Sequence, residues 1–510
     1  MEEIDKHKSD FYKYRKAVFV IIAISFIIRA FFAYSFELGN DEVYYWLLAA
    51  NPTLNYFDHP PMFAYFINLF SFGLAYDSEF FIRLSSLIIF SINTWIIFRI
   101  GKELLNARMG FIAVLLYQSS IYSFVITGIM IIPDTPLGLF WLLAMRSFLI
   151  ALRSKHIAKR EQRHMILAGI FIGLAIISKY QSVIFLAGAG VFIIISKREW
   201  LKKPQLYIAF LLSLLIILPI LWTNFNSANS NISFQTDRVQ VFGALTPIYF
   251  MREFIGQLVF NNPINVVIAL VAIFSFRKKK FLKAHDFQIL MWFGIPGILT
   301  FLFFSAFSAT LPHWSAPAYF ALMFISAAYL TQISHRRVPL AISFAIGLLL
   351  IILTAAYAQI NYGLLYHNKE KDITNLGVND LSLDLYGWNQ IAEGFLEKSV
   401  AKHAETRTII ARKWYNAAHI DYYIAQPNQM KLIALSNISD NHEYTRINQL
   451  RGEIKKGENA WFISVSRNYQ DPFVHFSYDF EKIEACDTIP VLRNNKVVEY
   501  AFVFYLQNHL

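Results

Sequence analysis

The stretch AVFVIIAISFIIRAFFAYS, residues 17–35, decides the class of the protein. Roughly 20 mostly apolar residues in a helix are enough to cross the hydrocarbon core of a bilayer. Basic residues precede the run, and no small-residue cleavage site follows it. The run therefore predicts a retained first membrane span rather than a signal peptide that is removed. The basic residues are Lys6, Lys8, Lys13, Arg15 and Lys16.

Similar apolar runs recur as far as about residue 360. Of the 510 residues, 56% are hydrophobic and only 16% are charged, whereas a soluble protein carries about a quarter charged residues. The sequence thus predicts a polytopic α-helical membrane protein with about 11 transmembrane helices. The candidate spans are 17–35, 81–100, 108–128, 134–152, 165–178, 181–196, 205–222, 263–276, 287–305, 315–333 and 338–357.

The net charge of +11 comes largely from short loops between these runs. Alternate connections carry Lys or Arg, which is the pattern by which cytoplasmic loops are recognised. The N-terminus is then predicted to be cytoplasmic and the C-terminus to lie outside. The positive charge is explained without a nucleic-acid partner, and none is expected. The basic connections are 102–108, 153–163, 197–203, 277–283 and 335–337, and the opposite ones include 36–80 and 223–262.

Beyond about residue 360 the apolar runs shorten and polar residues return. The domains predicted are a cytoplasmic tail at 1–16, a transmembrane domain at 17–360 with a first outer loop at 36–80, and a soluble α/β domain at 361–510. The single cysteine, Cys486, gives neither an intramolecular disulfide nor metal-site spacing. Strands are predicted at 408–411, 431–436, 460–465 and 497–505, and amphipathic helices at 388–400 and 415–425.

The first outer loop carries two polar clusters, GNDEVYYW at 39–46 and YFDHPP at 56–61. Adjacent carboxylates followed by three aromatic residues predict a short helix lying in the membrane interface. Asp41 and Glu42 would stand at the N-terminus of that helix, where negative charge is favoured. The alternative is a solvated surface turn.

Further polar residues lie at span ends on the same predicted side of the membrane: Arg83, Asp134, Lys179, Tyr180 and His313. Such residues are functional candidates because their burial is costly. Each also has a plainer interpretation. Asp134 could cap its helix, Lys179 could extend to the headgroups, and His313 could be an interfacial anchor beside a tryptophan.

Taken together, these acids, cations and aromatic rings suit a phosphate-bearing lipid substrate. Cations would hold the phosphate, a carboxylate would accept a proton from an acceptor hydroxyl, and aromatic rings would contact a sugar. No Walker motif, dinucleotide-binding glycine pattern or HExxH motif occurs in the sequence.

In combination the motifs resemble bacterial members of the protein O-mannosyltransferase-like superfamily, which includes the transferases that place aminoarabinose on lipid A. The resemblance covers about residues 17–360, with a weaker similarity at 386–388 and 415–423. The motifs that carry it are DE-x-YYW (41–46), YFDHPP (56–61), E-x-x-x-RL (79–84), PD-x-P (133–136), SKY (178–180) and PHW-x-x-P-x-Y (312–319).

The resemblance implies a GT-C fold and an enzyme that takes a monosaccharide from a polyprenyl-phosphate donor, usually with inversion at the anomeric carbon. The acceptor would be a lipid, a glycan or a protein. Asp41 maps to the family's candidate base or metal contact, accompanied by Glu42, and Asp134 maps to its Pro-Asp position. The residues expected to bind donor phosphate or sugar are His59, Arg83, Lys179, Tyr180, His313, Tyr44 and Tyr45.

The sequence shows no unambiguous set of metal ligands, so the use of a divalent metal ion is left open, and no other cofactor is expected. The expected location is the inner membrane of a bacterium, with the C-terminal domain in the periplasm. The main alternative is a transporter or flippase of a lipid-linked glycan, in which polar residues gather near the bilayer midplane. Transfer of a phosphoryl-linked headgroup and a purely structural scaffold are two others.

Overall fold

The computed structural model describes residues 2–154, 156–226, 244–365 and 372–510. The connection predicted at 223–262 and the start of the predicted C-terminal domain lie partly outside these residues. The chain divides into two compact units. We call Met1–Ala33 with Thr53–Leu350 the membrane unit, and Tyr34–Pro52 with Ile351–Leu510 the sheet unit. The sequence did not indicate that residues 34–52 pack with the C-terminal part of the chain.

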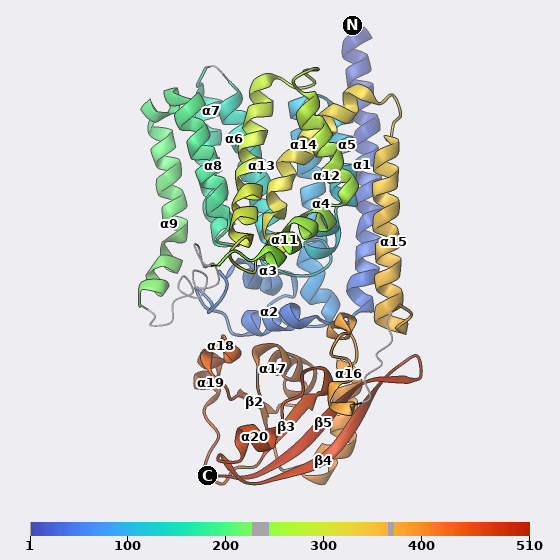
Figure 1. Cartoon of the computed structure of the whole chain (residues 1–510). Coiled ribbons are helices and arrows are strands. Elements are labelled where there is room, and N and C mark those ends of the chain that lie inside the picture. Colours follow the sequence, from blue (N-terminus) through green and yellow to red (C-terminus); the bar gives the residue numbers. More distant parts are fainter. Residues whose placement is uncertain (1, 155, 227–243, 366–371) are drawn as a thin grey trace. The chain divides into compact units, whose positions relative to one another are not determined.

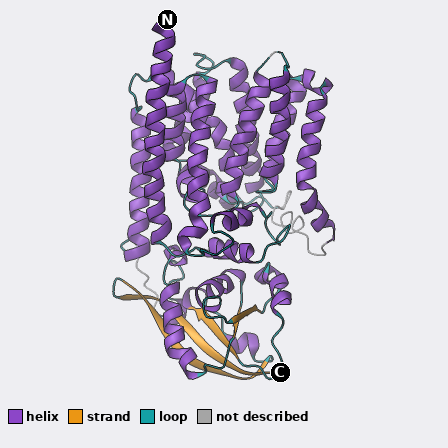
Figure 2. Ribbon diagram, turned by 180° about the vertical axis from the view of Figure 1, so that it is seen from behind, coloured by secondary structure: helices purple, strands orange, loops and turns teal. Residues whose placement is uncertain are grey.

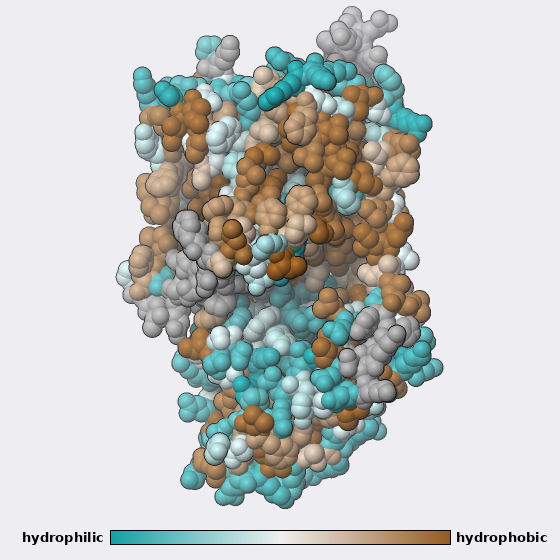
Figure 3. Space-filling view, viewed as in Figure 1, coloured by the Kyte–Doolittle hydropathy of each residue, from teal (hydrophilic) through white to brown (hydrophobic). Residues whose placement is uncertain are grey.

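The membrane unit is built from helices, most of which run side by side (Figures 1 and 2). Large apolar side chains are exposed over these helices, and Figure 3 shows them as a broad apolar surface. An apolar surface of this extent marks contact with lipid. The helices are α1 (Glu2–Ser35), α3 (Met62–Phe70), α4 (Glu79–Leu104), α5 (Ala107–Ser119), α6 (Asp134–Arg153), α7 (Lys159–Ile176), α8 (Ser182–Ser196), α9 (Pro204–Asn226), α11 (Pro247–Phe260), α12 (Pro263–Ser275), α13 (Ala284–Ser305), α14 (Tyr319–Ile333) and the first part of α15 (Leu340–Tyr362), whose residues from Ile351 on belong to the sheet unit.

Small residues let neighbouring helices of this unit approach closely, as is common in membranes. A Cβ added at Gly169 of α7 would lie 2.2 Å from the carbonyl oxygen of Ala209 on α9. A Cβ at Gly101 of α4 would lie 2.6 Å from the Cα of Gly110 on α5. Any larger residue at Gly169 or Gly101 would push these helix pairs apart.

The predicted count of 11 spans is not confirmed. Among the described residues, seven helices are long and apolar enough to cross a membrane. An eighth span results if α11 and α12, which meet at an angle of 94°, count as one broken span. Three of the predicted spans are not among these seven, because α5 stops at Ser119, α7 begins with a charged turn, and α8 has only 15 residues. The protein is nonetheless a multi-pass membrane protein.

The sheet unit contains a five-stranded sheet in the order β2-β1-β3-β5-β4. β1 is parallel to β2 and β3, whereas β5 is antiparallel to β3 and β4. The sheet buries an apolar cluster that includes Ile410, Phe462 and Phe504. The strands are β1 (Thr408–Ala411), β2 (Lys431–Ala434), β3 (Ala460–Val465), β4 (Phe480–Arg493) and β5 (Lys496–His509).

Four of these strands were predicted from the sequence, and β4 was not. β4 is an edge strand that pairs only with β5, and most of its side chains are at least partly exposed. It therefore lacks the apolar run by which a strand is recognised.

Three helices of the sheet unit form one packed group. α2 (Asn40–Ala50) is the short helix predicted in the first outer loop, and it packs against α17 (Trp414–Ile420). α17 continues as a π-helix at Asp421–Ala425, and α16 (Trp388–Gly394) packs beside it. The interfacial position predicted for α2 is untested by the fold.

Candidate functional site

Several of the predicted site residues lie at one end of the membrane unit. α6 begins at Asp134, Lys179 lies between α7 and α8, and His313 precedes α14. The basic connections 102–108, 153–163 and 197–203 join the opposite ends of these helices (Figure 1). The polar residues and the basic loops therefore lie at different ends of the helices, as the sequence predicted.

Asp134 and Lys179 form a buried ion pair at the centre of this group. Their side chains are 1% and 7% exposed, and the Lys179 ammonium contacts one carboxylate oxygen of Asp134. The other carboxylate oxygen accepts a hydrogen bond of 2.9 Å from the hydroxyl of Tyr122. Tyr122 begins a π-helix, Tyr122–Ile126, just before α6. We call Asp134, Lys179, Tyr122 and His313 the Asp134 cluster.

The structure overturns two of the plainer interpretations. Asp134 does not cap α6: the N-cap residue is Pro133, and the Asp134 side chain makes no capping hydrogen bond. Lys179 does not extend outward, because it is buried and paired. From the sequence, we expected a phosphate as the partner of Lys179. In the structure, its partner is the carboxylate of Asp134.

His313 completes the cluster from a third segment of the chain. It lies on the 3-10 helix Pro312–Ala318, with its ring 6.2 Å from the ring of Phe260. Electrostatic interactions connect His313 with Lys179, Asp134 and His59. Four of the predicted residues, distant in the sequence, are thus brought together within the membrane unit.

Two more predicted residues lie on the first-loop side of this group. His59 faces Asp58, with 3.9 Å between ring nitrogen and carboxylate oxygen. Tyr180, next to Lys179, donates a hydrogen bond of 3.1 Å from its hydroxyl to the side-chain oxygen of Asn55. The loop residues 55–59 are therefore tied to the segment that carries Lys179.

Arg83 is buried on α4, and its guanidinium donates a hydrogen bond of 2.9 Å to the backbone oxygen of Ala33 at the end of α1. At least one of its donors is therefore engaged by the protein itself. Its predicted contact with donor phosphate remains a prediction.

The sequence analysis missed Glu253 of α11, a buried acid near the segment that carries His313. Its carboxylate accepts hydrogen bonds from Gln257 at 2.8 Å and from Thr310 at 2.7 Å. Gln257 in turn accepts one of 2.9 Å from Tyr319. This network ties α11 to the segment around His313. The sequence analysis treated residues 223–262 as a connection. An acid within an apolar helix is nevertheless a sign of a functional site, because its burial is costly.

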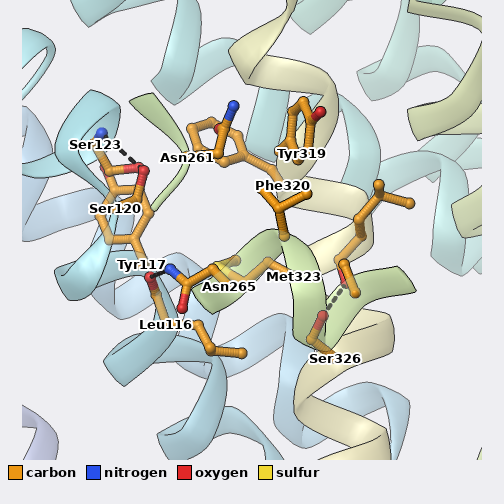
Figure 4. Close-up of a pocket in the computed structure, with 13 residues that line it drawn as sticks. Leu116, Tyr117, Ser120, Ser123, Asn261, Asn265, Tyr319, Phe320, Met323 and Ser326 are labelled. Carbon is orange, nitrogen blue, oxygen red and sulfur yellow. Dashed lines mark hydrogen bonds between the residues drawn. The ribbon is translucent and has the colours of Figure 1, made fainter. Parts of the chain in front are cut away.

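A small cavity lies beside Tyr319 of this network (Figure 4). Its volume is about 30 Å³, and Tyr117, Ser120, Asn261 and Tyr319 are among the residues that line it. A cavity of this size has room for about one or two water molecules. It is too small for a sugar, so it is not the place where a glycosyl donor would bind.

The remaining predicted residues belong to the sheet unit, on α2. The side chain of Asp41 is exposed on the first turn. Glu42 is buried, and its carboxylate accepts a hydrogen bond of 3.1 Å from the backbone N–H of Gly39 at the N-cap. Glu42 thus caps its own helix.

Tyr44 and Tyr45 are also buried. The hydroxyl of Tyr44 accepts a hydrogen bond of 3.2 Å from the backbone N–H of Glu443, and its ring lies 4.9 Å from that of Trp414. Tyr44 therefore contributes to packing within the sheet unit. The catalytic and binding roles predicted for the residues of α2 remain predictions.

A metal site was left open by the sequence. Among the residues that the structure describes, no group of three or more His, Cys, Asp or Glu side chains could hold a metal ion. Both carboxylate oxygens of Asp134 already contact protein groups. The use of a divalent metal ion stays open, and no chemical step proposed for this chain involves one.

Comparisons with known proteins agree with this architecture. Residues 58–222 match the family model of dolichyl-phosphate-mannose-protein mannosyltransferase. No curated protein matches the chain in sequence.

Solved structures resemble the chain over nearly its whole length. ArnT from Cupriavidus metallidurans in the apo state is 13% identical, with a TM-score of 0.64 over 96% of this chain and 98% of that one. The same protein bound to undecaprenyl phosphate is 14% identical, with a TM-score of 0.64 over 95% and 97% of the two chains. The oligosaccharyltransferase AglB from Archaeoglobus fulgidus, with an inhibitory peptide and a dolichol-phosphate, is 13% identical with a TM-score of 0.44, over 86% and 69%. The likeness to ArnT shows a GT-C fold, which confirms the predicted fold class.

Proposed function

We propose that this chain, a multi-pass membrane protein with the GT-C fold and a match to the protein mannosyltransferase family model, is a glycosyltransferase. It takes a monosaccharide from a polyprenyl-phosphate donor and transfers it to a lipid, glycan or protein acceptor. The observation that carries the proposal is the buried Asp134–Lys179 pair, with His313 and Tyr122 beside it, at the end of the helices opposite the basic loops.

The chemistry of such a transfer fits the residues of the Asp134 cluster. The bond between the anomeric carbon and the phosphate oxygen breaks, and a bond to the acceptor oxygen forms. The acceptor loses its proton to a base, and the polyprenyl phosphate leaves with an additional negative charge. A fixed cation beside that phosphate stabilises the charge that develops, provided that it is oriented in advance.

Lys179 is the cation that we assign to this task. Its contact with Asp134 restricts the ammonium to one position, and the desolvated surroundings strengthen its attraction for a phosphate. His313 approaches the same pair and is a second potential donor to the phosphate. Asp134 would act by holding Lys179, while Asp41 of the first loop remains the proposed base.

The donor class and the cellular location belong to the same proposal. A protein of the same fold has been solved with undecaprenyl phosphate, which supports a polyprenyl phosphate here. The basic connections favour a cytoplasmic location for their end of the helices. The Asp134 cluster would then work at the periplasmic face of a bacterial inner membrane.

The proposal is tested by mass spectrometry of envelope glycolipids and glycans from cells with and without the gene. The deletion is complemented with wild type, with Asp134→Asn or with Asp286→Asn. Asp286 is a matched control because it also forms a buried ion pair, with Arg153 at 2.7 Å, but at the opposite end of the helices. We expect one sugar linkage to be lost in the deletion and in Asp134→Asn cells, and restored by Asp286→Asn.

Both substitutions break a buried pair, which typically costs about 3–5 kcal/mol of stability. The amounts of each protein in the membrane are therefore compared by immunoblot. If both variants restore the linkage equally, the Asp134 cluster has no role in transfer. If whole lipid-linked glycans accumulate in the deletion while every linkage is still made, the protein is a transporter or flippase instead.

A further inference from the structure

The chain leading into α2 is held by the sheet unit on two sides. The carboxylate of Glu37 accepts hydrogen bonds from the backbone N–H groups of Trp388, at 2.7 Å, and Asn389, at 3.1 Å, where α16 begins. The backbone N–H of Leu38 donates a hydrogen bond of 2.8 Å to the hydroxyl of Tyr423. Residues 37 and 38 thus contact two elements that lie more than 300 positions later in the sequence.

The first residue of α2, Asn40, is held through both ends of its side-chain amide. Its oxygen lies 3.0 Å from the ring nitrogen Nε2 of His419, and the amide also forms a side-chain hydrogen bond with Asp384. An amide oxygen only accepts, so Nε2 of His419 carries the proton. The ring of His419 is buried and stacked on Trp388, with centroids 4.2 Å apart and planes 7° from parallel.

The contacts continue from Asp384 to the sheet. Asp384 pairs with the Nη1 atom of Arg467 at 3.0 Å, and the Nε atom of the same guanidinium lies 3.0 Å from the carboxylate of Glu499. Glu499 is a buried residue of β5. We call His419, Asn40, Asp384, Arg467 and Glu499 the Asn40 relay.

The relay leads from the sheet to the residue directly before Asp41. Within the relay, His419, Arg467 and Glu499 are buried, whereas Asn40 and Asp384 are partly exposed. Displacing Asn40 would take away the partner of the buried His419 Nε2, so the contact favours one position of Asn40. The other end of α2 is held as well, since Arg446 donates a hydrogen bond of 2.7 Å to the backbone oxygen of Asn51. α2 is therefore a short helix whose position is set from both ends by the sheet unit.

We infer that the Asn40 relay is a positioning device for the carboxylate of Asp41. This inference rests on the proposed function, in which Asp41 is the base. Asp41 directly follows Asn40 on the first turn of α2, so the position of its carboxylate depends on the backbone that the relay holds. Misplacing a reacting group by about 1 Å lowers a rate roughly 10²-fold.

The first variant is Asn40→Ala, which removes both contacts of the amide. We expect kcat to fall about 10- to 100-fold, with little change in KM for the polyprenyl-phosphate sugar found by mass spectrometry. The matched control is Asn51→Ala, the same substitution at the other end of α2, where the side chain contacts only Leu47 of its own helix. Asn51→Ala should keep kcat within about threefold of wild type, a rate change worth less than roughly 1 kcal/mol.

A second pair of variants separates positioning from folding. In Asn40→Asp, a carboxylate would face Asp384, and we expect the same loss of kcat as in Asn40→Ala. Asn40→Asp combined with Asp384→Asn exchanges the amide and the carboxylate. After the exchange, one of the two positions again donates a hydrogen bond and the other accepts it, and the total charge is that of wild type. We therefore expect kcat to recover to within about threefold of wild type. A relay that only stabilises the sheet unit would change the melting temperature and leave kcat unaltered.

The outcomes distinguish the inference from the proposed function. If wild-type protein does not transfer sugar from a polyprenyl phosphate, the proposed function fails. If it does, and if either Asn40 variant keeps kcat, the inference is overturned while the function stands. Equal losses in Asn40→Ala and Asn51→Ala, or an exchange variant that folds without regaining kcat, also overturn it. Should Asn40→Ala fail to fold, the Asn40→Asp and exchange variants decide the question.

Discussion

At the scale of single residues, the sequence and the structure give different kinds of information about the two predicted acids. Asp134 was interpreted from the sequence as a possible helix cap, and its partners Lys179 and Tyr122 identify it as half of a buried pair. Asp41 is recognised by its motif, while the structure adds how its helix is held. The role of Asp134 is therefore supported by its contacts in the structure, and that of Asp41 by its sequence motif.

The prediction at this scale concerns Asp41→Asn. The substitution keeps the size of the side chain but removes a base that would contribute about 10²–10⁴-fold to the rate. We expect transfer measured with purified, folded protein to fall by at least about 10²-fold.

Asp479→Asn, which alters another exposed acid of the sheet unit, is the control and should keep full activity. Near-normal turnover by folded Asp41→Asn protein would remove Asp41 from its proposed role.

At the scale of elements, the sequence did not predict α11 or its bend of 94° to α12. Glu253 and Gln257 of α11 bind the segment that carries His313. Gly256 allows α11 to approach the 3-10 helix Pro312–Ala318 closely, since a Cβ at Gly256 would lie 2.3 Å from the ring of Pro312.

Gly256→Ala should therefore displace the 3-10 helix Pro312–Ala318 from α11, or strain both. We expect a lower melting temperature and a loss of activity of about tenfold or more, because His313 immediately follows Pro312. The measurement is transfer activity together with thermal unfolding in detergent. Gly347→Ala of α15, with no atom within 4 Å of the added Cβ, should leave both unchanged. Activity of Gly256→Ala at the wild-type level would show that this contact does not position His313.

At the scale of the whole molecule, the sheet unit should respond to pH through Glu499. Burial raises the pKa of Glu499 from 4.5 to about 7, although Arg467 opposes the shift. A raised pKa means that the folded state favours the protonated acid. Its stabilising contribution is complete below about pH 4.5 and is lost as the pH rises through about 7. Burial lowers the pKa of His419, which has the opposite effect and penalises folding at low pH.

Comparing Glu499→Gln with wild type isolates the first effect, because His419 is present in both. The free energy of unfolding of the variant, relative to wild type, should rise by up to about 3 kcal/mol between pH 4.5 and pH 7. Above about pH 8, this difference in the free energy of unfolding should no longer change with pH. Chemical unfolding of the full chain, followed by tryptophan fluorescence at several pH values, measures it. A difference that does not depend on pH would place the pKa of Glu499 near its ordinary value.

Much of this architecture is predictable from the sequence, and the exceptions have physical reasons. Apolar runs and basic loops identify the membrane part because the bilayer imposes strict length and charge rules. The pairing of Asp134 with Lys179 was not predictable, because it depends on how three helices pack. Glu253 was missed because Arg252 and Glu253 interrupt the apolar run of α11, so the segment was interpreted as a connection. The grouping of residues 34–52 with the C-terminal part depends on contacts such as Glu37 with Trp388, which no local pattern reveals.

That grouping also has a consequence for biosynthesis. Residues 34–52 leave the ribosome some 300 residues before their partners in α16, α17 and β5. The helix that carries Asp41 therefore remains without these partners while the intervening spans are synthesised. A nascent chain halted after α15 would contain those spans and still lack the elements that hold α2. Under this scheme, catalytic competence would be acquired only after β5 has been translated.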